Sequence, residues 1–190
     1  MVDERKRPTA DEIRSILGLE PHPTCGWTTL SYLNRHRIAN EALPPGYQGT
    51  HTLASALYFL VTPERQMKLH RLRSDQIYHH YLGDPLEVLL LLPDGSGALA
   101  VVGSDLAAGM RPQLLIPGGA WHVSRLKTGG SYALLGTTEW PGFDPSDLQI
   151  ADVAFPTSQT SRPLRRPDVA GGCRARRPTI PREPMVQAAG

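Results

Sequence analysis

The spacing of apolar residues divides this chain into one short helix followed by a long series of strands. Residues 9–18 carry apolar side chains three and four positions apart, which is the spacing of one helical face. Thr9 is followed three residues later by Glu12, the pattern of a capping box, and Gly18 supplies a typical helix stop. We therefore predict an amphipathic helix whose apolar stripe consists of Ile13, Ile16 and Leu17.

After the helix, the chain breaks into short runs bounded by Gly, Pro, Asp and Ser. The runs are rich in strand-forming residues and recur at roughly regular intervals, which predicts an all-β sandwich or barrel. The run at 85–92 would also suit a buried helix, but the Pro-Asp-Gly-Ser-Gly sequence after it favours a strand and a hairpin. The predicted strands are 26–34, 56–62, 67–73, 76–82, 86–92, 97–103, 112–117, 120–126 and 132–140.

The composition changes near residue 157. The last segment mixes Pro, Arg, Gly and Ser without periodicity, so it cannot bury enough apolar surface to offset its ordering entropy. It holds seven arginines against Asp168 and Glu183, and because the whole chain carries +2, the rest is mildly acidic. We expect no nucleic-acid surface on the folded part. The predicted organisation is a flexible N-terminus at 1–8, one domain at 9–156 and a disordered tail at 157–190.

Length and composition limit the class of protein. The chain has 190 residues, of which 40% are apolar, enough for one ordinary domain with a core. It contains no apolar run of about eighteen residues, and its charged N-terminus lacks the apolar segment of a secretory signal. Cys25 and Cys173 lie far apart and the second falls in the predicted tail, so we expect no structural disulfide. These features predict a cytoplasmic protein with no membrane partner.

The segment 69–85 concentrates three of the seven histidines, and alternation decides which of them can share a cavity. If two strands joined by a turn form here, successive side chains point to opposite faces. His79 then faces away from the other polar candidates of its strand. Unless a bulge intervenes, the shared face holds Gln76, Tyr78 and His80.

The spacing of this segment resembles the first motif of the cupin superfamily, His-x-His followed by Glu and then Gly. The four motif positions are occupied by His70, Leu72, Gln76 and Gly83. The second cupin motif, Pro-x-Gly-x-x-His followed by Asn, is also present with one departure. Its positions are occupied by Pro117, Gly119, His122 and, in place of Asn, Leu126.

A more specific resemblance runs in order from about residue 11 to 150. The stretches LGLEPHP, HRLRSDQIYHHYLGDPLEVLLL and GMRPQLLIPGGAWH are similar to one small single-cupin family long catalogued as a domain of unknown function. This resemblance implies a double-stranded β-helix, or jelly-roll barrel, that is often dimeric and similar to sugar-nucleotide epimerases of the cupin type. It implies the fold and names no reaction.

In metal-binding cupins, the two His and the Glu of the first motif and the His of the second hold one metal ion. Here Leu72 cannot coordinate a metal, and Gln76 offers only a neutral amide oxygen. His80 is a further candidate donor. We therefore expect either no cofactor or one weakly bound Zn²⁺, Ni²⁺ or Fe²⁺ ion, held by His70, Gln76, His122 and His80.

Without a metal, the same residues suit proton transfer. Imidazoles inside a half-apolar barrel titrate near neutrality and can move protons. We expect His70 and His122 to face each other across the cavity as base and acid. Tyr78 would donate to a developing oxyanion, and Gln76 would orient a carbonyl or hydroxyl group.

Four further residues are predicted to contact the substrate, and each also has a structural interpretation. Glu87 lies in an apolar run, where a charge needs a partner or a wet cavity, and an ion pair with a nearby arginine is the simpler interpretation. Trp121, like Tyr78, is of a type more often found in the core. The predicted substrate-binding set is His80, Trp121, Glu87 and Arg125.

Two residues outside the motifs are weaker candidates. Cys25 lies in a loop that, in the family, covers one end of the barrel, and it would act as a nucleophile only if His22 or another base reached it. His51 would reach the mouth of the pocket but belongs to no motif.

The sequence contains no nucleotide-binding glycine motif and no serine-hydrolase elbow, which sets those chemistries aside. We predict a small cupin enzyme, an isomerase, epimerase, cyclase or lyase, acting on a small polar metabolite in natural-product or deoxysugar tailoring. One alternative is a metal-dependent dioxygenase or isomerase. Another is a ligand-binding cupin without turnover, which the changes at positions 72 and 76 would suit. Because jelly-roll edges commonly pair across a two-fold axis, we expect a homodimer.

Overall fold

The computed structural model describes residues 7–151. The predicted flexible N-terminus, for residues 1–6, and the predicted disordered tail lie outside the described residues. Within them, α1 (Ala10–Leu17) forms where the apolar stripe predicted it. The Thr9 side chain accepts the Glu12 backbone N–H, the Glu12 carboxylate accepts the Thr9 N–H, and Gly18 ends the helix in the left-handed conformation. The capping box is therefore confirmed.

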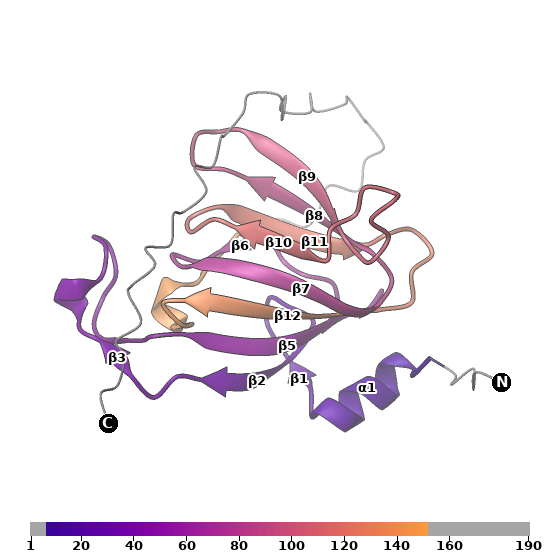
Figure 1. Cartoon of the computed structure of the whole chain (residues 1–190), viewed down its shortest axis with the longest axis horizontal. Coiled ribbons are helices and arrows are strands. Elements are labelled where there is room, and N and C mark those ends of the chain that lie inside the picture. The colour runs from indigo at the N-terminus through magenta and orange to yellow at the C-terminus, as the bar shows by residue number, and fades with distance from the viewer. Residues whose placement is uncertain (1–6, 152–190) are drawn as a thin grey trace, which may run out of the picture.

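Two antiparallel sheets face each other and enclose the core (Figure 1). The first sheet, in spatial order, contains β1 (Glu20–Pro21), β2 (Trp27–Leu33), β5 (Ser55–Val61), β12 (Ala133–Trp140), β7 (Asp75–Gly83) and β10 (Gln113–Ile116). The second contains β13 (Gln149–Ile150), β6 (His70–Arg71), β11 (Trp121–Leu126), β8 (Leu86–Leu91) and β9 (Gly97–Val102). The predicted all-β jelly-roll fold is confirmed, although the strand expected at 67–73 is reduced to β6.

The core lies between the sheets because alternate residues of each strand point inward. Phe59 and Tyr78 from the first sheet meet Leu86 and Val88 from the second, and all four side chains are buried. The helix packs on the outer face of the first sheet instead. There it forms a separate apolar cluster with strand residues, made of Ile13, Leu19, Leu60, Tyr132 and Leu134.

A bulge interrupts β7 where it pairs with β12. Leu135 pairs with His80 and Leu134 pairs with Leu82, so Tyr81 has no partner residue on β12. An extra residue of this kind changes the face to which following side chains point. The bulge lies after His80, so Gln76, Tyr78 and His80 keep one register and one face, and the alternation changes only from Tyr81 onward.

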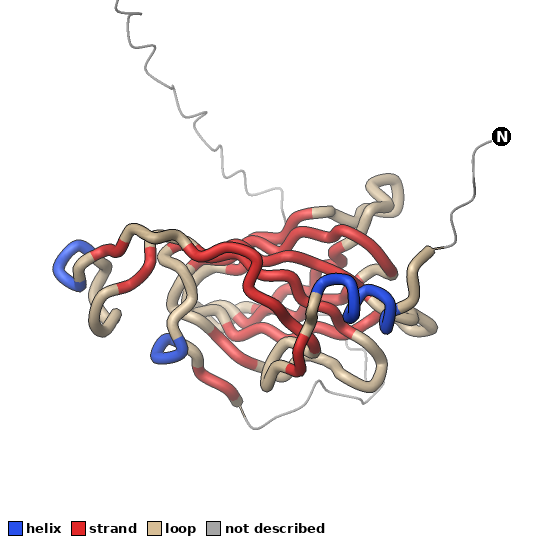
Figure 2. Tube along the Cα trace, turned by 90° about the horizontal axis from the view of Figure 1, so that it is seen from below, coloured by secondary structure: helices blue, strands red, loops and turns tan. Residues whose placement is uncertain are grey.

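An arm projects from the barrel between β2 and β5, and it contains η1 (Asn40–Ala42) and the small β3–β4 sheet (Figure 2). Its strands are β3 (Arg37–Ile38) and β4 (His51–Thr52). The last short helix, η2 (Pro145–Asp147), lies against the base of the arm through the contact of Asp147 with His51. Over the described residues, no helix has the length and apolar character needed to cross a membrane.

Candidate functional site

A small cavity lies inside the barrel, between the first sheet and β6. About 40 Å³ of it is open to the centre of a water molecule. Because one water requires roughly 10–15 Å³ by the same measure, the enclosed space suits a few waters or a small organic group. Its polar lining is His22, Thr24, Cys25, Thr28, His70, Gln76, Tyr78, Thr137 and Glu139, and its apolar lining is Leu57, Phe59, Leu72, Phe143 and Leu148.

The two motif histidines lie against each other, but only His70 lines this cavity, and the arrangement is not the predicted one. His70 on β6 is paired in register with His122 on the adjacent strand β11. Their ring centroids are 4.1 Å apart, and both side chains are buried. The imidazoles therefore lie side by side, and the expectation that they face each other across the cavity is wrong. The reason is that neighbouring strands, not opposite walls, carry the two motifs.

Backbone carbonyls fix the protonation pattern of both rings. His70 Nδ1 lies 2.8 Å from the Lys68 carbonyl, and His122 Nδ1 lies 3.4 Å from the Ala120 carbonyl. A carbonyl oxygen only accepts, so each Nδ1 carries the hydrogen and each Nε2 keeps its lone pair. His122 Nε2 then accepts from the Tyr78 hydroxyl at 3.1 Å. His70 Nε2 has no such strong donor and is the more available base.

Burial keeps these groups uncharged. It lowers the pKa of His70 to about 4 and lowers the pKa of His122 well below its usual value. Burial also raises the pKa of Tyr78 well above its usual value, so its hydroxyl stays protonated. His122 is therefore a neutral imidazole near neutral pH, and it lacks the second proton that the predicted role as acid requires.

Glu139 is the acidic group that sequence reasoning missed. On β12, alternation from Leu135 through Thr137 directs the Glu139 side chain into the cavity, where only 2% of the residue is exposed. Burial raises the pKa of this carboxyl to about 7, although the Ser55 hydroxyl donates to it at 2.9 Å. The strand predicted at 132–140 could have identified Glu139, because its alternation places this residue inward. Burying a carboxylate there costs free energy unless the group has a function or a partner.

The remaining polar lining can orient a ligand. The Thr137 hydroxyl donates to Gln76 Oε1 at 3.4 Å, which leaves the amide N–H groups of Gln76 as donors near the cavity. Cys25 Sγ lies 4.0 Å from His70 Nε2 and 3.2 Å from Thr24 Oγ1. Burial raises the pKa of the Cys25 thiol to about 12, so the thiol is protonated and is not an activated nucleophile.

The four predicted substrate-binding residues do not line this cavity. Glu87 and Arg125 are cross-strand partners and form an ion pair at 2.9 Å. They alternate with the buried Val88 and Ser124, so they lie on the outer face of the second sheet, as does Trp121, which stacks under Arg71. Glu87 thus forms the ion pair that its structural interpretation predicted, and Glu87, Arg125 and Trp121 all lie outside the cavity.

Two other histidines of the first sheet also point elsewhere. His80 shares a face with Gln76 but lies further along β7, where its Nε2 hydrogen-bonds the Asp84 carbonyl at 3.2 Å. It does not line the cavity. His79 lies on the outer face, where its ring contacts Thr138 Oγ1 at 3.0 Å and Gln113 Nε2 at 3.1 Å, as its opposite alternation predicted.

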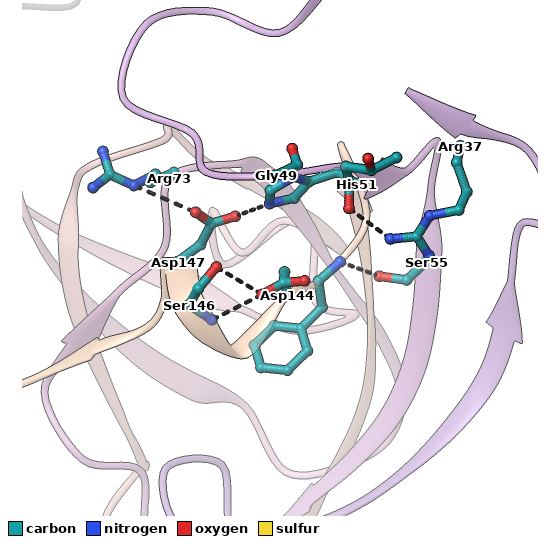
Figure 3. A network of polar contacts seen from close by, with 10 residues as sticks. Arg37, Gly49, His51, Ser55, Arg73, Asp144, Ser146 and Asp147 are labelled. Carbon is teal, nitrogen blue, oxygen red and sulfur yellow. Dashed lines mark hydrogen bonds and ion pairs between the residues drawn. The ribbon is translucent and has the colours of Figure 1, made fainter. Parts of the chain in front are cut away.

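His51 belongs to a separate polar network at the base of the arm (Figure 3). Its Nε2 lies 2.7 Å from Asp147 Oδ2, and its Nδ1 lies 3.3 Å from the Gly49 carbonyl. Asp147 also contacts Arg73 at 3.3 Å. Both ring nitrogens are therefore engaged, and the ring does not line the cavity mouth.

The donor set does not fit the metal site of the superfamily. Position 72 presents a buried leucine to the cavity, and position 76 presents an amide that already accepts from Thr137. His122 Nε2 accepts from Tyr78, and His80 is turned toward a backbone carbonyl. No group of three or more His, Cys, Asp or Glu residues suited to a metal ion occurs between residues 7 and 151. The predicted four-residue ligand set is therefore not assembled.

The jelly-roll barrel, with the two motif histidines in contact on adjacent strands, is of the cupin class. The chain belongs to the family described as "Cupin superfamily (DUF985)", whose model matches residues 11–151. No curated protein matches the sequence.

Two solved structures are similar over most of the chain. A hypothetical protein from Leishmania major is 29% identical, with a TM-score of 0.69, and the match covers 76% of this chain and 88% of that one. A protein from Shewanella oneidensis is 31% identical, with a TM-score of 0.66, covering 76% and 85% respectively.

Proposed function

We propose that this cupin is an enzyme that moves protons on a small polar metabolite, with His70 as the general base and Glu139 as the general acid. One observation carries the proposal: a buried imidazole with an available lone pair and a buried carboxyl line the same small cavity. Buried ionisable groups of this kind are costly to the fold and concentrate at functional sites.

The pKa values of His70 and Glu139 leave both groups uncharged over a shared pH range. The pKa of His70 is lowered to about 4, and that of Glu139 is raised to about 7. Between these values the dominant state has a neutral imidazole and a protonated carboxyl, which is a base and an acid ready together. The predicted rate is bell-shaped, rising as pH increases through about 4 and falling through about 7.

The reaction class follows from a base and an acid acting on one carbonyl compound. His70 Nε2 removes a proton from the carbon next to the carbonyl, and the carboxyl of Glu139 gives its proton to the carbonyl oxygen, forming an enol. Return of the proton to another position or face gives isomerisation or epimerisation, and loss of a neighbouring leaving group gives elimination. Gln76 and Thr137 would hold the carbonyl, and the Tyr78–His122 pair would keep His70 in place.

Hydrogen exchange tests this proposal without knowledge of the natural substrate. Small hydroxycarbonyl compounds are incubated with the protein in D₂O, and loss of the α-proton signal is followed by NMR. We expect exchange with the wild-type chain, and at least a hundredfold reduction in His70→Asn and Glu139→Gln, in keeping with typical acid–base contributions of about 10²–10⁴. Glu87→Gln, which removes a carboxylate from the outer face, should retain full activity. Undiminished exchange in the cavity variants would refute the assignment.

A ligand-binding cupin without turnover is the second candidate, and Leu72 and Gln76 favour it because both replace the metal ligands of the superfamily. The same hydroxycarbonyl compounds distinguish this ligand-binding cupin from the proposed enzyme. Binding that saturates in calorimetry, without any exchange of the α-proton across pH 4 to 8, would support the binder and exclude the enzyme.

A further inference from the structure

The groups that line the cavity carry no positive charge near neutral pH. Its histidines, His22 and His70, both have a pKa lowered by burial, so their rings are neutral imidazoles in that range. No Arg or Lys of residues 7–151 is among the lining residues. A buried anion needs a cation nearby to offset the loss of its hydration, and the described lining offers none.

Glu139 adds to this bias against anions. Its carboxylate accepts from the Ser55 hydroxyl at 2.9 Å, and the Ser55 oxygen in turn accepts the Phe143 N–H at 2.9 Å. When protonated, the carboxyl can donate to the oxygen of a ligand. When ionised, it repels a ligand anion in a space where charges are poorly screened. Neither state provides the positive charge that an anionic ligand requires.

Two arginines flank the cavity residue Leu72 in the chain, and both are directed elsewhere. Arg73 pairs with Asp147 at 3.3 Å at the base of the arm (Figure 3). It lines a separate open cleft, none of whose lining residues belongs to the cavity. Arg71 lies over the Trp121 ring, which is outside the cavity. Neither arginine therefore supplies a charge to a ligand in the cavity.

The volume of the cavity limits the ligand further. The 40 Å³ open to the centre of a water molecule corresponds to about three waters, a volume that a compound of about three to five non-hydrogen atoms would fill. The Gln76 amide and His70 Nε2 can contact a carbonyl or hydroxyl group, and Phe59 and Leu72 can pack against the carbon atoms. The lining thus suits a short polar molecule without charge.

We propose that the cavity selects an uncharged hydroxycarbonyl compound of about two to four carbon atoms, and that it rejects carboxylates, phosphates and nucleotide-linked sugars. The choice of a carbonyl compound rests on the proposed proton-transfer function. The preference for an uncharged ligand comes from the lining itself, so the two can be tested separately.

NMR titration of the ¹⁵N-labelled full-length chain tests the ligand class. Hydroxyacetone and glycolate are nearly equal in size, but only glycolate is an anion near neutral pH. Hydroxyacetone should shift the signals of the Gln76 side-chain amide and the His70 imidazole until they saturate. Glycolate should bind at least tenfold more weakly, because its charge is buried without a partner. Fructose, which is uncharged but larger, should leave both signals unchanged.

A cation placed in the lining should reverse the selection. Thr28 on β2 lines the cavity, whereas Thr29, the next residue, points to the opposite face of the sheet. Thr28→Lys should strengthen glycolate binding at least tenfold. Thr29→Lys adds the same charge outside the cavity and should bind both compounds as the wild type does. Circular dichroism establishes that each variant is folded before its titration is interpreted.

Two sets of results separate the ligand class from the proposed function. Glycolate bound by the wild type as tightly as hydroxyacetone would overturn the ligand class, whether or not Thr28→Lys folds. Absence of hydroxyacetone binding would do the same, as would a folded Thr28→Lys chain with no gain for glycolate. Selective binding of hydroxyacetone without exchange of its α-protons in D₂O would instead retain the ligand class and refute the proposed enzyme.

Discussion

Two buried histidine sites in this barrel differ in what their ring nitrogens contact. His51 and His70 are exposed by only 1% and 2%, so burial alone does not distinguish them. Both nitrogens of His51 are engaged, one by Asp147 and one by the Gly49 carbonyl. His70 uses Nδ1 to hold its orientation and directs Nε2 toward Cys25 at 4.0 Å, at the cavity wall.

This difference separates a histidine that supports the fold from one that is available for chemistry. A ring with two strong partners can exchange a proton only by breaking a contact that stabilises the fold. A ring with one partner keeps its tautomer and still has a lone pair to offer. We therefore expect changes around His51 to lower the stability of the fold and spare the chemistry, whereas changes at His70 and Glu139 should impair the chemistry.

Asp147→Ala should have the largest effect on stability. The substitution leaves His51 Nε2 buried without its partner and removes the contact with Arg73. Breaking a buried polar pair of this kind costs about 3–5 kcal/mol of unfolding free energy. Urea denaturation at neutral pH measures the loss.

Asp144→Ala is the matched control on the same turn. Asp144 caps η2 by accepting from the Ser146 N–H at 2.9 Å and is partly exposed, whereas Asp147 is buried. Loss of such a cap costs about 1 kcal/mol. Equal losses in the two variants would mean that the His51 network is no more than an ordinary surface contact.

Glu139→Gln should raise the stability of the fold, unlike Asp147→Ala, and the size of the gain should depend on pH. The wild-type pKa is about 7 in the fold against 4.5 for the ordinary value, a difference of 2.5. A raised pKa stabilises the fold at low pH, and this contribution is lost as pH rises from about 4.5 to 7. The variant should match the wild type near pH 4 and exceed it by up to about 3 kcal/mol at pH 8, at 1.36 kcal/mol per pKa unit.

Thermal or urea unfolding across this pH range provides the measurement. Glu87→Gln serves as the control, because its ion pair with Arg125 lies at the surface. Losing that pair should destabilise the fold by less than about 1 kcal/mol. A Glu139→Gln chain that is no more stable than the wild type at pH 8 would show that the carboxyl has a cationic partner in solution.

Local periodicity was enough to predict α1 and the longer strands, and the resemblance carried by the motif spacing implied the jelly roll and brought His70 and His122 together. Their side-by-side placement was not predictable, since it depends on which strands become neighbours. His80 shares the face of Gln76 and Tyr78 but lies nearer the Asp84 end of the strand, and alternation alone does not tell where along a strand a cavity lies. Glu139 was accessible in principle, because the predicted strand places it inward, two residues beyond Thr137.

Tyr78→Phe should have the smallest of these effects on stability. It tests how the Tyr78 hydroxyl supports the imidazole of His122. The hydroxyl donates to His122 Nε2, so its removal leaves a buried acceptor without a partner, at a cost of about 1–2 kcal/mol. Tyr81→Phe, whose residue is 49% exposed on the outer face, should change stability by less than about 0.5 kcal/mol. Urea denaturation compares the two, and ¹⁵N NMR of the imidazoles reports the tautomer. Because the Ala120 carbonyl still fixes Nδ1–H, His122 should remain neutral in the Tyr78→Phe chain at pH 7, and a protonated ring there would contradict the assigned geometry.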